Sequence, residues 1–427
     1  MKVAVVGSGP SGFYAVEALL SAGQDIEVDL YERLPVPFGL VRHGVAPDHP
    51  RLKSVSDVFE KIAQTPKLTF FGNIQLGRDI HVNELAEHYD AVLIAIGASA
   101  DRKLGIRGEE LKGVHSASEF VGWYNGHPDY RDISFDFSHN RAVVVGLGNV
   151  ALDVCRILLK SVGELRCTDI AEHALDALAE SKIKEVVLVG RGGPADAKFS
   201  PKELREITEL PGIVTHVNLR DFDDVESVVP GSVSAKNIEI LRRIPHSNGA
   251  AEKTCSFRFH STPEGFDGRQ RLTGMTFASR DNCKPIKIEA GLVIRSVGYR
   301  GEVVDGLPFD DATGTIPNEQ GRVIGISAPL YVAGWIKRGP TGIIGTNRAC
   351  SLATVERLLN DMKTMPRRNS RGSAGVAEIL ERRSARPSSY ADWNTLDHLE
   401  QMAGRKLGKP RQKFTRIHEM LAAIDRP

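Results

Sequence analysis

The chain has 427 residues, of which 41% are hydrophobic and 26% charged, the composition of an ordinary globular protein with room for two domains. A formal net charge of +1 excludes the strongly basic surface of a general nucleic-acid-binding protein. Apolar runs are short, and residues 91–96 are an example of the longest. We therefore expect no membrane span, no signal peptide and a cytoplasmic location.

The cysteines are few and widely separated, and none forms a C-x-x-C pair. An odd number at such spacing argues against a disulfide framework, an iron–sulfur site or a redox dithiol. We therefore expect reduced thiols and no bound metal, with cysteines at Cys155, Cys167, Cys255, Cys283 and Cys350.

The first thirty-two residues have the pattern of a strand, a glycine turn, a helix and a second strand. The turn reads Gly-x-Gly-x-x-Gly over residues 7–12. An amphipathic helix is predicted from Ser11 to about Ala22, and the second strand covers residues 27–31 and ends at Glu32. This order is the βαβ fingerprint of a dinucleotide-binding fold.

Each part of this fingerprint has a physical role. Gly7 permits the tight turn, Gly9 lets the backbone approach a pyrophosphate, and Gly12 lets the helix pack closely on the strand. The free N–H groups at the helix N-terminus attract the phosphates. Glu32 can accept hydrogen bonds from ribose hydroxyls.

The segment after Glu32 predicts a functional loop followed by the rest of a nucleotide-binding sheet. Residues 33–53 are rich in Pro and Gly but also dense in His, Arg and Lys, which favours a functional loop. A helix is predicted at residues 57–64 and a strand at 68–71. Residues 89–97 read as a buried parallel strand that ends in Gly97.

A second fingerprint covers residues 141–153, with Ala151 in place of the third glycine. Its helix runs to about Lys160, an inserted helix follows at residues 169–180, and the next strand, residues 185–189, ends at Gly190-Arg191. An arginine here suits a 2′-phosphate, whereas Glu32 suits a free 2′-hydroxyl. Two different dinucleotides are implied, one of them NADP, although Arg191 as a solvated surface residue is the alternative.

The remaining elements suggest that the chain returns to its first domain. A helix is predicted at residues 201–209, and residues 210–290 read as β-rich. Buried strands at 292–298 and 330–335 precede a glycine-rich turn and a helix at 347–362.

The predicted fold is α/β, with two Rossmann-like domains, the NADP domain being inserted in a discontinuous FAD domain. Residues 1–102 and 297–362 form the FAD domain and residues 103–296 the NADP domain. Residues 363–427 form a C-terminal extension with fourteen Lys and Arg against seven Asp and Glu. We expect a flexible linker over residues 363–389 around one short helical stretch, then short helices near 393–402 and 415–424. The extension could be a solvated appendage or a second surface for the partner.

Two nested dinucleotide domains are what a flavoprotein pyridine-nucleotide oxidoreductase needs, because the nicotinamide and the flavin must meet. At this level the sequence resembles the adrenodoxin reductase-like ferredoxin–NADP reductases, the glutathione-reductase type without a redox disulfide. The resemblance covers nearly all of residues 1–362 and depends on residues 7–12, 37–50, 146–153, 295–300 and 334–346.

The resemblance implies cofactor contacts at matching positions. For FAD these are Gly7, Gly9, Ser11, Gly12, Glu32, Arg33, Leu40, Leu76, Gly97, Gly334, Trp335, Gly342, Ile343 and Ile344. For NADP they are Arg102, Leu147, Gly148, Asn149, Val150, Arg191, Gly192, Glu203 and Gly342. His49 and Glu206 match a catalytic polar pair beside the nicotinamide and flavin. By their chemistry they could orient the carboxamide and handle a proton.

One departure from the family concerns the 2′-phosphate. The family usually reads Gly-Arg-Arg-Gly after the NADP-domain strand, whereas this chain reads Gly190-Arg191-Gly192-Gly193. A lost charge-assisted contact costs about 1.5–3 kcal/mol, roughly tenfold or more in binding. Lys198 could compensate as a point charge.

The expected function is therefore that of an FAD-dependent ferredoxin–NADP(+) reductase. It takes a hydride from NADPH and passes two electrons singly to a small iron–sulfur ferredoxin, expected to be acidic. Alternatives are an NAD(P)H diaphorase or quinone reductase, or a non-catalytic FAD-binding sensor or assembly subunit. We expect a monomer or weak dimer. Candidate docking charges are Lys198, Lys202, Arg205, Arg242, Arg243, Lys337 and Arg338.

Overall fold

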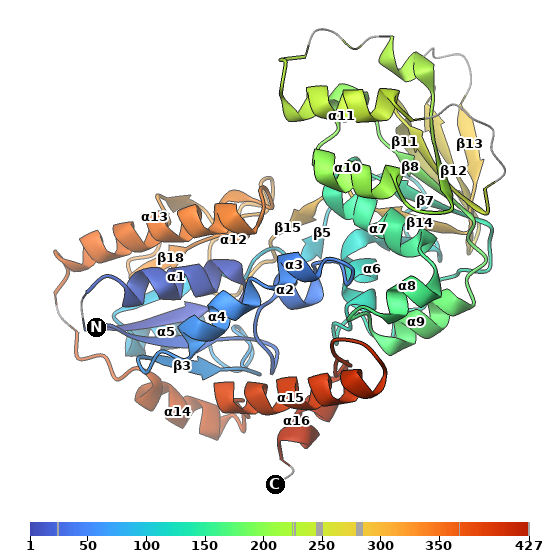
Figure 1. Cartoon of the computed structure of the whole chain (residues 1–427). Coiled ribbons are helices and arrows are strands. Elements are labelled where there is room, and N and C mark those ends of the chain that lie inside the picture. The colour runs from blue at the N-terminus through green and yellow to red at the C-terminus, as the bar shows by residue number, and fades with distance from the viewer. Residues whose placement is uncertain are drawn as a thin grey trace. The chain divides into compact units, whose positions relative to one another are not determined.

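The computed structural model describes residues 1–23, 25–223, 225, 228–244, 251–278, 285–366 and 368–425. Two units are formed by residues Met1–Ala100 with Gly298–Pro427, and by Asp101–Val297. Each has its own sheet (Figure 1). Each also has its own hydrophobic cores. The four cysteines within the described residues are free, and Cys283 lies outside them.

The first unit is organised around a seven-stranded sheet. Its strand order is β16 (Asn318–Glu319), β17 (Arg322–Val323), β18 (Leu330–Val332), β4 (Ala91–Ile94), β1 (Lys2–Val6), β2 (Glu27–Tyr31) and β3 (Leu68–Phe71). The strands from β18 to β3 are parallel. Since β18 pairs with β4, the prediction that the C-terminal part of the chain returns to the first sheet is confirmed.

The alternation of side chains along β1 fills two cores, one on each face of this sheet. Val3 and Val5 pack with the helices α1 (Pro10–Leu20), α4 (Ser56–Ala63), α13 (Ile344–Met362), α15 (Tyr390–Lys406) and α16 (Ile417–Ile424). Ala4 and Val6 pack on the other face with α5 (Val82–His88) and α14 (Ser373–Arg382). Shorter helices of this unit are α2 (Leu40–His43), α3 (Pro50–Lys53) and α12 (Trp335–Arg338).

The C-terminal extension, residues 363–425, is a folded part of the first unit. Leu380, Trp393 and Met420 are buried in the cores of the unit. Residues 363–389 were expected to hold one short helical stretch, and they contain α14, in which Val376, Ile379 and Leu380 form a buried stripe at helical spacing. They are thus not the flexible linker that was expected.

The second unit contains a six-stranded parallel sheet whose two faces are covered by different elements. The strand order is β6 (Val114–Ser116), β14 (Leu292–Arg295), β7 (Arg141–Val145), β8 (Glu185–Val189), β10 (Lys253–Arg258) and β9 (Ile213–Val217). The core on one face includes side chains of α6 (Ala117–Tyr124), α7 (Asn149–Leu159), α8 (Val162–Arg166), α9 (Glu172–Ala179), α10 (Pro201–Thr208) and α11 (Val233–Arg242). The other core includes the antiparallel strands β11 (Thr262–Gly268), β12 (Leu272–Ala278) and β13 (Ile286–Glu289).

The expectation that residues 210–290 are β-rich is wrong for α11. Ser232 caps this helix by accepting a hydrogen bond from the Ala235 N–H, and Ile238 and Leu241 are buried beneath it. Short strands β5 (Ala100–Asp101) and β15 (Tyr299–Arg300) lie where the chain crosses between the units. Within the described ranges, the apolar stretches of the helices are too short or too polar to span a bilayer.

Candidate functional site

The glycine turn of the first unit has the geometry of a phosphate-binding turn. Gly7 has φ +103°, a conformation that favours glycine. A Cβ at Gly12 would lie 1.8 Å from the Gly7 carbonyl oxygen, so α1 approaches the strand too closely for any side chain there. A Cβ at Gly9 would meet nothing within 4 Å, and the N-terminus of α1 follows it. An anion therefore has access to the first N–H groups of α1.

Glu32 lies beside this turn at the carboxyl end of β2. One carboxylate oxygen, Oε2, accepts hydrogen bonds from the Ser8 N–H at 3.0 Å and the Ser8 hydroxyl at 2.6 Å. The other, Oε1, accepts from the Leu34 N–H at 3.1 Å. A carboxylate offers about four lone-pair sites, so this fixed group can also accept from a ribose hydroxyl.

Two segments that are distant in the sequence lie beside the same glycine turn. The Phe38 N–H donates to the Ser8 carbonyl at 3.1 Å, and a Cβ at Gly39 would lie 3.0 Å from the Gly9 Cα. On the other side, a Cβ at Gly334 would lie 2.0 Å from the Ser11 hydroxyl oxygen. The first unit thus brings residues 7–12, 37–40 and 334 together.

Some of the apolar side chains among the predicted FAD contacts are exposed to solvent. Leu40 is 39% exposed and Ile343, just before α13, is 71% exposed. Trp335 stacks on Tyr299 with ring centroids 5.6 Å apart, and its buried indole Nε1 has no hydrogen-bond partner among the described residues. A planar ring system with hydrogen-bonding edges suits these groups, so the residues present fit FAD. Of the other predicted contacts, Arg33, Leu76 and Gly97 follow β2, β3 and β4, and Gly342 and Ile344 lie at the start of α13.

The second unit repeats the turn at Gly146. This residue has φ +139°, and a Cβ there would lie 2.1 Å from the Ser296 carbonyl oxygen, whereas a Cβ at Gly148 would meet nothing within 4 Å. The segment before α10 closes on this turn, since the Lys198 N–H donates to the Leu147 carbonyl at 2.8 Å. The Ser200 N–H donates to the Asn149 side-chain oxygen at 2.7 Å. These two hydrogen bonds fix the turn from Leu147 to Val150, while the space beside Gly148 leaves its backbone accessible to a ligand.

The structure gives a physical reason for glycine at position 192. A Cβ at Gly192 would lie 2.7 Å from the Asp196 Cβ, and Asp196 accepts a hydrogen bond from the Gly193 N–H at 2.8 Å. A second arginine would have to displace Asp196. Arg191 and Lys198 are both exposed at the carboxyl end of β8 and just beyond it.

Sequence reasoning missed the buried arginine that pairs with the predicted acidic residues of α10. Arg156 on α7 is 1% exposed, and its guanidinium lies 3.5 Å from Glu203, 3.9 Å from Glu206 and 2.6 Å from Asp153. Arg156 thus connects α10 to α7, the helix that starts at the second glycine turn. The signal was an Asp153-x-x-Arg156 pair, whose arginine lies on the apolar face of its helix.

The two predicted catalytic residues belong to different units. His49 is a buried residue at the start of α3 in the first unit. Glu206 is partly buried on α10 in the second. Arg102, a predicted NADP contact, is an exposed residue immediately after β5 in the second unit.

Comparisons with known proteins show what the chain is similar to as a whole. Residues 1–188 match the family model described as pyridine nucleotide-disulphide oxidoreductase. The chain is 43% identical to the NADPH-ferredoxin reductase FprA of Mycobacterium tuberculosis, over 98% of both chains. It is 42% identical to the human mitochondrial NADPH:adrenodoxin oxidoreductase, over 99% of this chain and 92% of the relative. The solved structure of Mycobacterium tuberculosis FprA in complex with NADPH superposes with a TM-score of 0.94, covering 99% of each chain at 41% identity.

Proposed function

The chain belongs to the family of NADPH-dependent ferredoxin and adrenodoxin reductases, as its sequence motifs indicated, and we propose that it passes electrons from NADPH through FAD to an acidic ferredoxin. It is thus an oxidoreductase with FAD and NADP(H) as cofactors and a ferredoxin-type partner. The proposal is supported by the pair of glycine turns. Glu32 directly follows strand β2 after the first turn, and Arg191 lies two residues beyond strand β8 after the second.

FAD is assigned to the first unit. Glu32 accepts from its ribose, the N-terminus of α1 faces its pyrophosphate, and Leu40, Trp335 and Ile343 cover its ring. The other residues that the family resemblance implied as FAD contacts are proposed to contact FAD as well. When bound there, FAD supplies the chemistry of accepting a hydride and releasing its electrons singly.

NADP is assigned to the second unit. The N-terminus of α7 faces the pyrophosphate, and Arg191 and Lys198 provide positive charge for the 2′-phosphate. His49 and Glu206 orient the carboxamide and handle a proton. Two cations flank the Glu206 carboxylate, Lys202 at 3.5 Å and the buried Arg156 at 3.9 Å.

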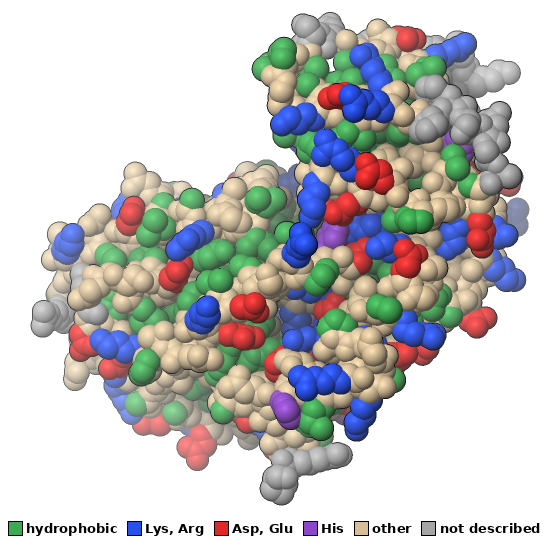
Figure 2. All heavy atoms as spheres, viewed as in Figure 1, with side chains coloured by type: hydrophobic (Ala, Val, Ile, Leu, Met, Phe, Trp, Pro, Cys, Tyr) green, Lys and Arg blue, Asp and Glu red, His purple; other side chains and the backbone are tan. Residues whose placement is uncertain are grey.

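The partner is proposed to dock on the basic face of α10 and α11. Figure 2 shows Lys and Arg side chains gathered over these two helices. Lys202 and Arg205 are exposed on α10, and Arg242 and Arg243 are exposed at the end of α11. Opposite charge on an acidic ferredoxin would speed their encounter, with an effect that falls as salt increases.

The docking proposal is tested by charge reversal. The double variant Arg205→Glu/Arg242→Glu is expected to lower the ferredoxin-dependent rate at low salt by about tenfold or more, while the reduction of a small dye stays unchanged. The control Lys184→Glu reverses an exposed charge at the amino end of β8. Equal effects of the control and the double variant would reject this docking face.

The cofactor assignment has its own test. The purified protein should be yellow, and its flavin absorbance should bleach on anaerobic addition of NADPH. A protein that binds flavin but is not bleached by NADPH would be a sensor or assembly subunit, and the proposed activity would be wrong.

A further inference from the structure

Arg295 belongs to a family-like stretch, residues 295–300, whose role the two cofactor sites leave unexplained. It is the last residue of β14 and lies beside Val145 of β7, one residue before Gly146. The following residue, Ser296, has its carbonyl oxygen against Gly146. Arg295 therefore lies next to the glycine turn of the second unit, although its side chain is only 9% exposed.

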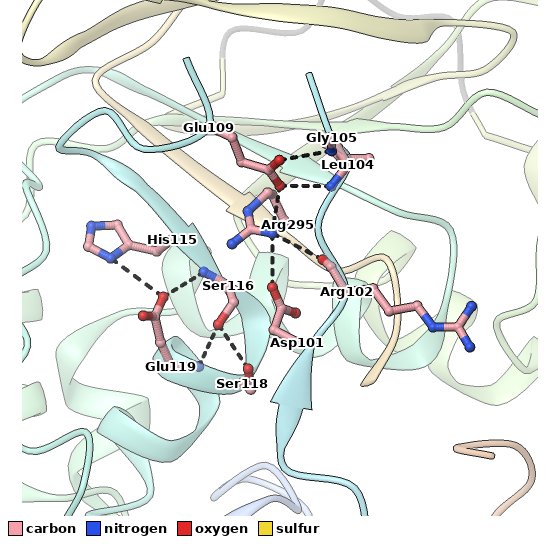
Figure 3. Close-up of polar contacts among 10 residues, drawn as sticks. All are labelled: Asp101, Arg102, Leu104, Gly105, Glu109, His115, Ser116, Ser118, Glu119 and Arg295. Atoms are coloured by element: carbon pink, nitrogen blue, oxygen red, sulfur yellow. Dashed lines mark hydrogen bonds and ion pairs between the residues drawn. The ribbon is translucent and has the colours of Figure 1, made fainter. Parts of the chain in front are cut away.

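The guanidinium of Arg295 binds the segment that follows β5 (Figure 3). Its Nη1 donates to the Arg102 carbonyl oxygen at 3.0 Å and to Glu109 Oε1 at 2.8 Å. The same nitrogen lies 2.9 Å from Asp101 Oδ2. All three contacts converge on one nitrogen atom, so the arginine joins residues about 190 positions apart in the sequence.

Glu109 completes the arrangement from the other side. Its Oε1 also accepts from the Leu104 N–H at 2.7 Å, and its Oε2 accepts from the Gly105 N–H at 2.9 Å. The backbone of residues 101–105 is thus fixed by Arg295 at a carbonyl group and by Glu109 at two N–H groups. Hydrogen bonds that involve a charged group are the stronger kind, and those of Arg295 and the Glu109–Leu104 bond are partly buried.

Arg102 is the residue whose placement this arrangement determines. Its backbone is held by Arg295, while its side chain points away from the cluster in Figure 3 and is exposed. In the proposed function, Arg102 is a contact of NADP. A guanidinium on a fixed backbone loses less conformational entropy when it binds a phosphate than one on a mobile loop.

We propose that Arg295 and Glu109 are positioning residues for the nicotinamide nucleotide: together they fix residues 101–105 beside the Gly146 turn, so that the Arg102 side chain is presented to NADP. This inference depends on the proposed role of Arg102, and it adds two residues that act only through the backbone of that segment. Neither residue needs to touch the nucleotide.

The test measures the dissociation constant of NADP(+) for the oxidised holoenzyme by direct titration. Arg102→Ala is expected to weaken binding about tenfold, the value of one charge-assisted contact. Arg295→Met should weaken it several-fold, roughly threefold to tenfold, because residues 101–105 lose their anchor. In steady-state assays the KM for NADPH should rise while kcat changes by less than about twofold, since the chemistry is untouched.

Arg295→Lys is the conservative variant. A lysine keeps the positive charge and has three N–H donors, but its side chain is one bond shorter than that of arginine. It should keep part of these contacts and weaken binding less than Arg295→Met does. Arg107→Gln is the matched control, since this exposed arginine of the same unit pairs with Asp267 at 3.1 Å. It should leave NADP(+) binding unchanged. If Arg295→Met does not fold, Glu109→Gln keeps one acceptor and should show a smaller loss.

A double-mutant cycle separates positioning from a general loss of structure. If Arg295 acts through Arg102, then Arg295→Met should cost less than about twofold in the Arg102→Ala background. Full additivity, or unchanged binding in Arg295→Met, would overturn the inference while leaving the reductase function intact. A wild-type protein that binds no NADP(+) would instead reject the proposed function itself.

Discussion

The guanidinium of Arg42 lies over the indole ring of Trp393, 5.1 Å from the ring centroid. Arg42 also pairs with Glu400 of α15, whose side chain is completely buried. Trp393 packs edge-on against Phe38 at 5.6 Å, and the Phe38 N–H donates to Ser8 in the glycine turn. The C-terminal extension is therefore connected by direct contacts to the proposed FAD site.

Substituting Glu400 by Ala should destabilise the first unit. The variant leaves Arg42, 6% exposed, without its carboxylate partner. Removing one member of a buried ion pair costs about 3–5 kcal/mol. Chemical denaturation followed by flavin fluorescence should detect this loss. The control Glu419→Ala changes an exposed carboxylate of the same extension and should cost less than about 1 kcal/mol. Similar midpoints for the two variants would contradict this account.

Substituting Lys198 by Ala should weaken NADPH binding more than NADH binding. Lys198 is exposed next to the proposed NADP turn, and Gly192 supplies no second guanidinium. We expect an increase in the NADPH dissociation constant of about fivefold to tenfold, and little change for NADH, which lacks the 2′-phosphate. Lys184→Ala is the control. If the dissociation constant of NADPH is unchanged in Lys198→Ala, then Lys198 does not bind this phosphate, and Arg191 alone remains the proposed cation for it.

Substituting Glu206 by Gln should slow the bleaching of the flavin by NADPH by about a hundredfold, if Glu206 handles a proton. Stopped-flow absorbance at saturating NADPH measures this step without the partner. Glu209→Gln, an exposed residue one turn away, is the control. A Glu206→Gln variant that is bleached at the wild-type rate would remove Glu206 from the catalytic pair.

The Arg295 cluster makes stability depend on pH. Burial raises the pKa of Asp101 to about 7, with Glu119 and Glu109 adding to the increase and Arg295 opposing it. An unfolded aspartate ionises near pH 4, so between about pH 4 and 7 the folded protein holds a proton that the unfolded chain has released. The free energy of unfolding should therefore fall as pH rises through this window. Denaturant melts of Asp101→Asn should show a weaker pH dependence, and identical slopes would contradict the raised pKa.

The sequence predicted the elements whose signals are local. Strand β2 has the predicted bounds, residues 27–31, because a short β-rich run between turn residues is unambiguous. By contrast, α11 was missed because half of its ten residues are polar and only two apolar side chains, Ile238 and Leu241, are buried on its inner face. One short helical stretch was expected near α14, but the Gly, Ser and Arg residues around it gave no sign that its three larger apolar side chains are buried in the first unit.

The interactions around the cofactor turns could not be read in the same way. Arg295 reaches Asp101 and Glu109, and Arg42 reaches Glu400, across 186 to 358 positions of sequence. Such pairs depend on which strands become neighbours, and a single sequence shows no spacing that reveals them. A buried arginine in an apolar strand or helix was the only local sign.

The most direct test of the reductase account is cytochrome c reduction by the purified protein, with and without added ferredoxin, first with NADPH and then with NADH. The account predicts a rate that depends strongly on ferredoxin and is higher with NADPH. A rate that does not respond to ferredoxin but rises with quinones or dyes would contradict it, and would assign the protein to the diaphorases.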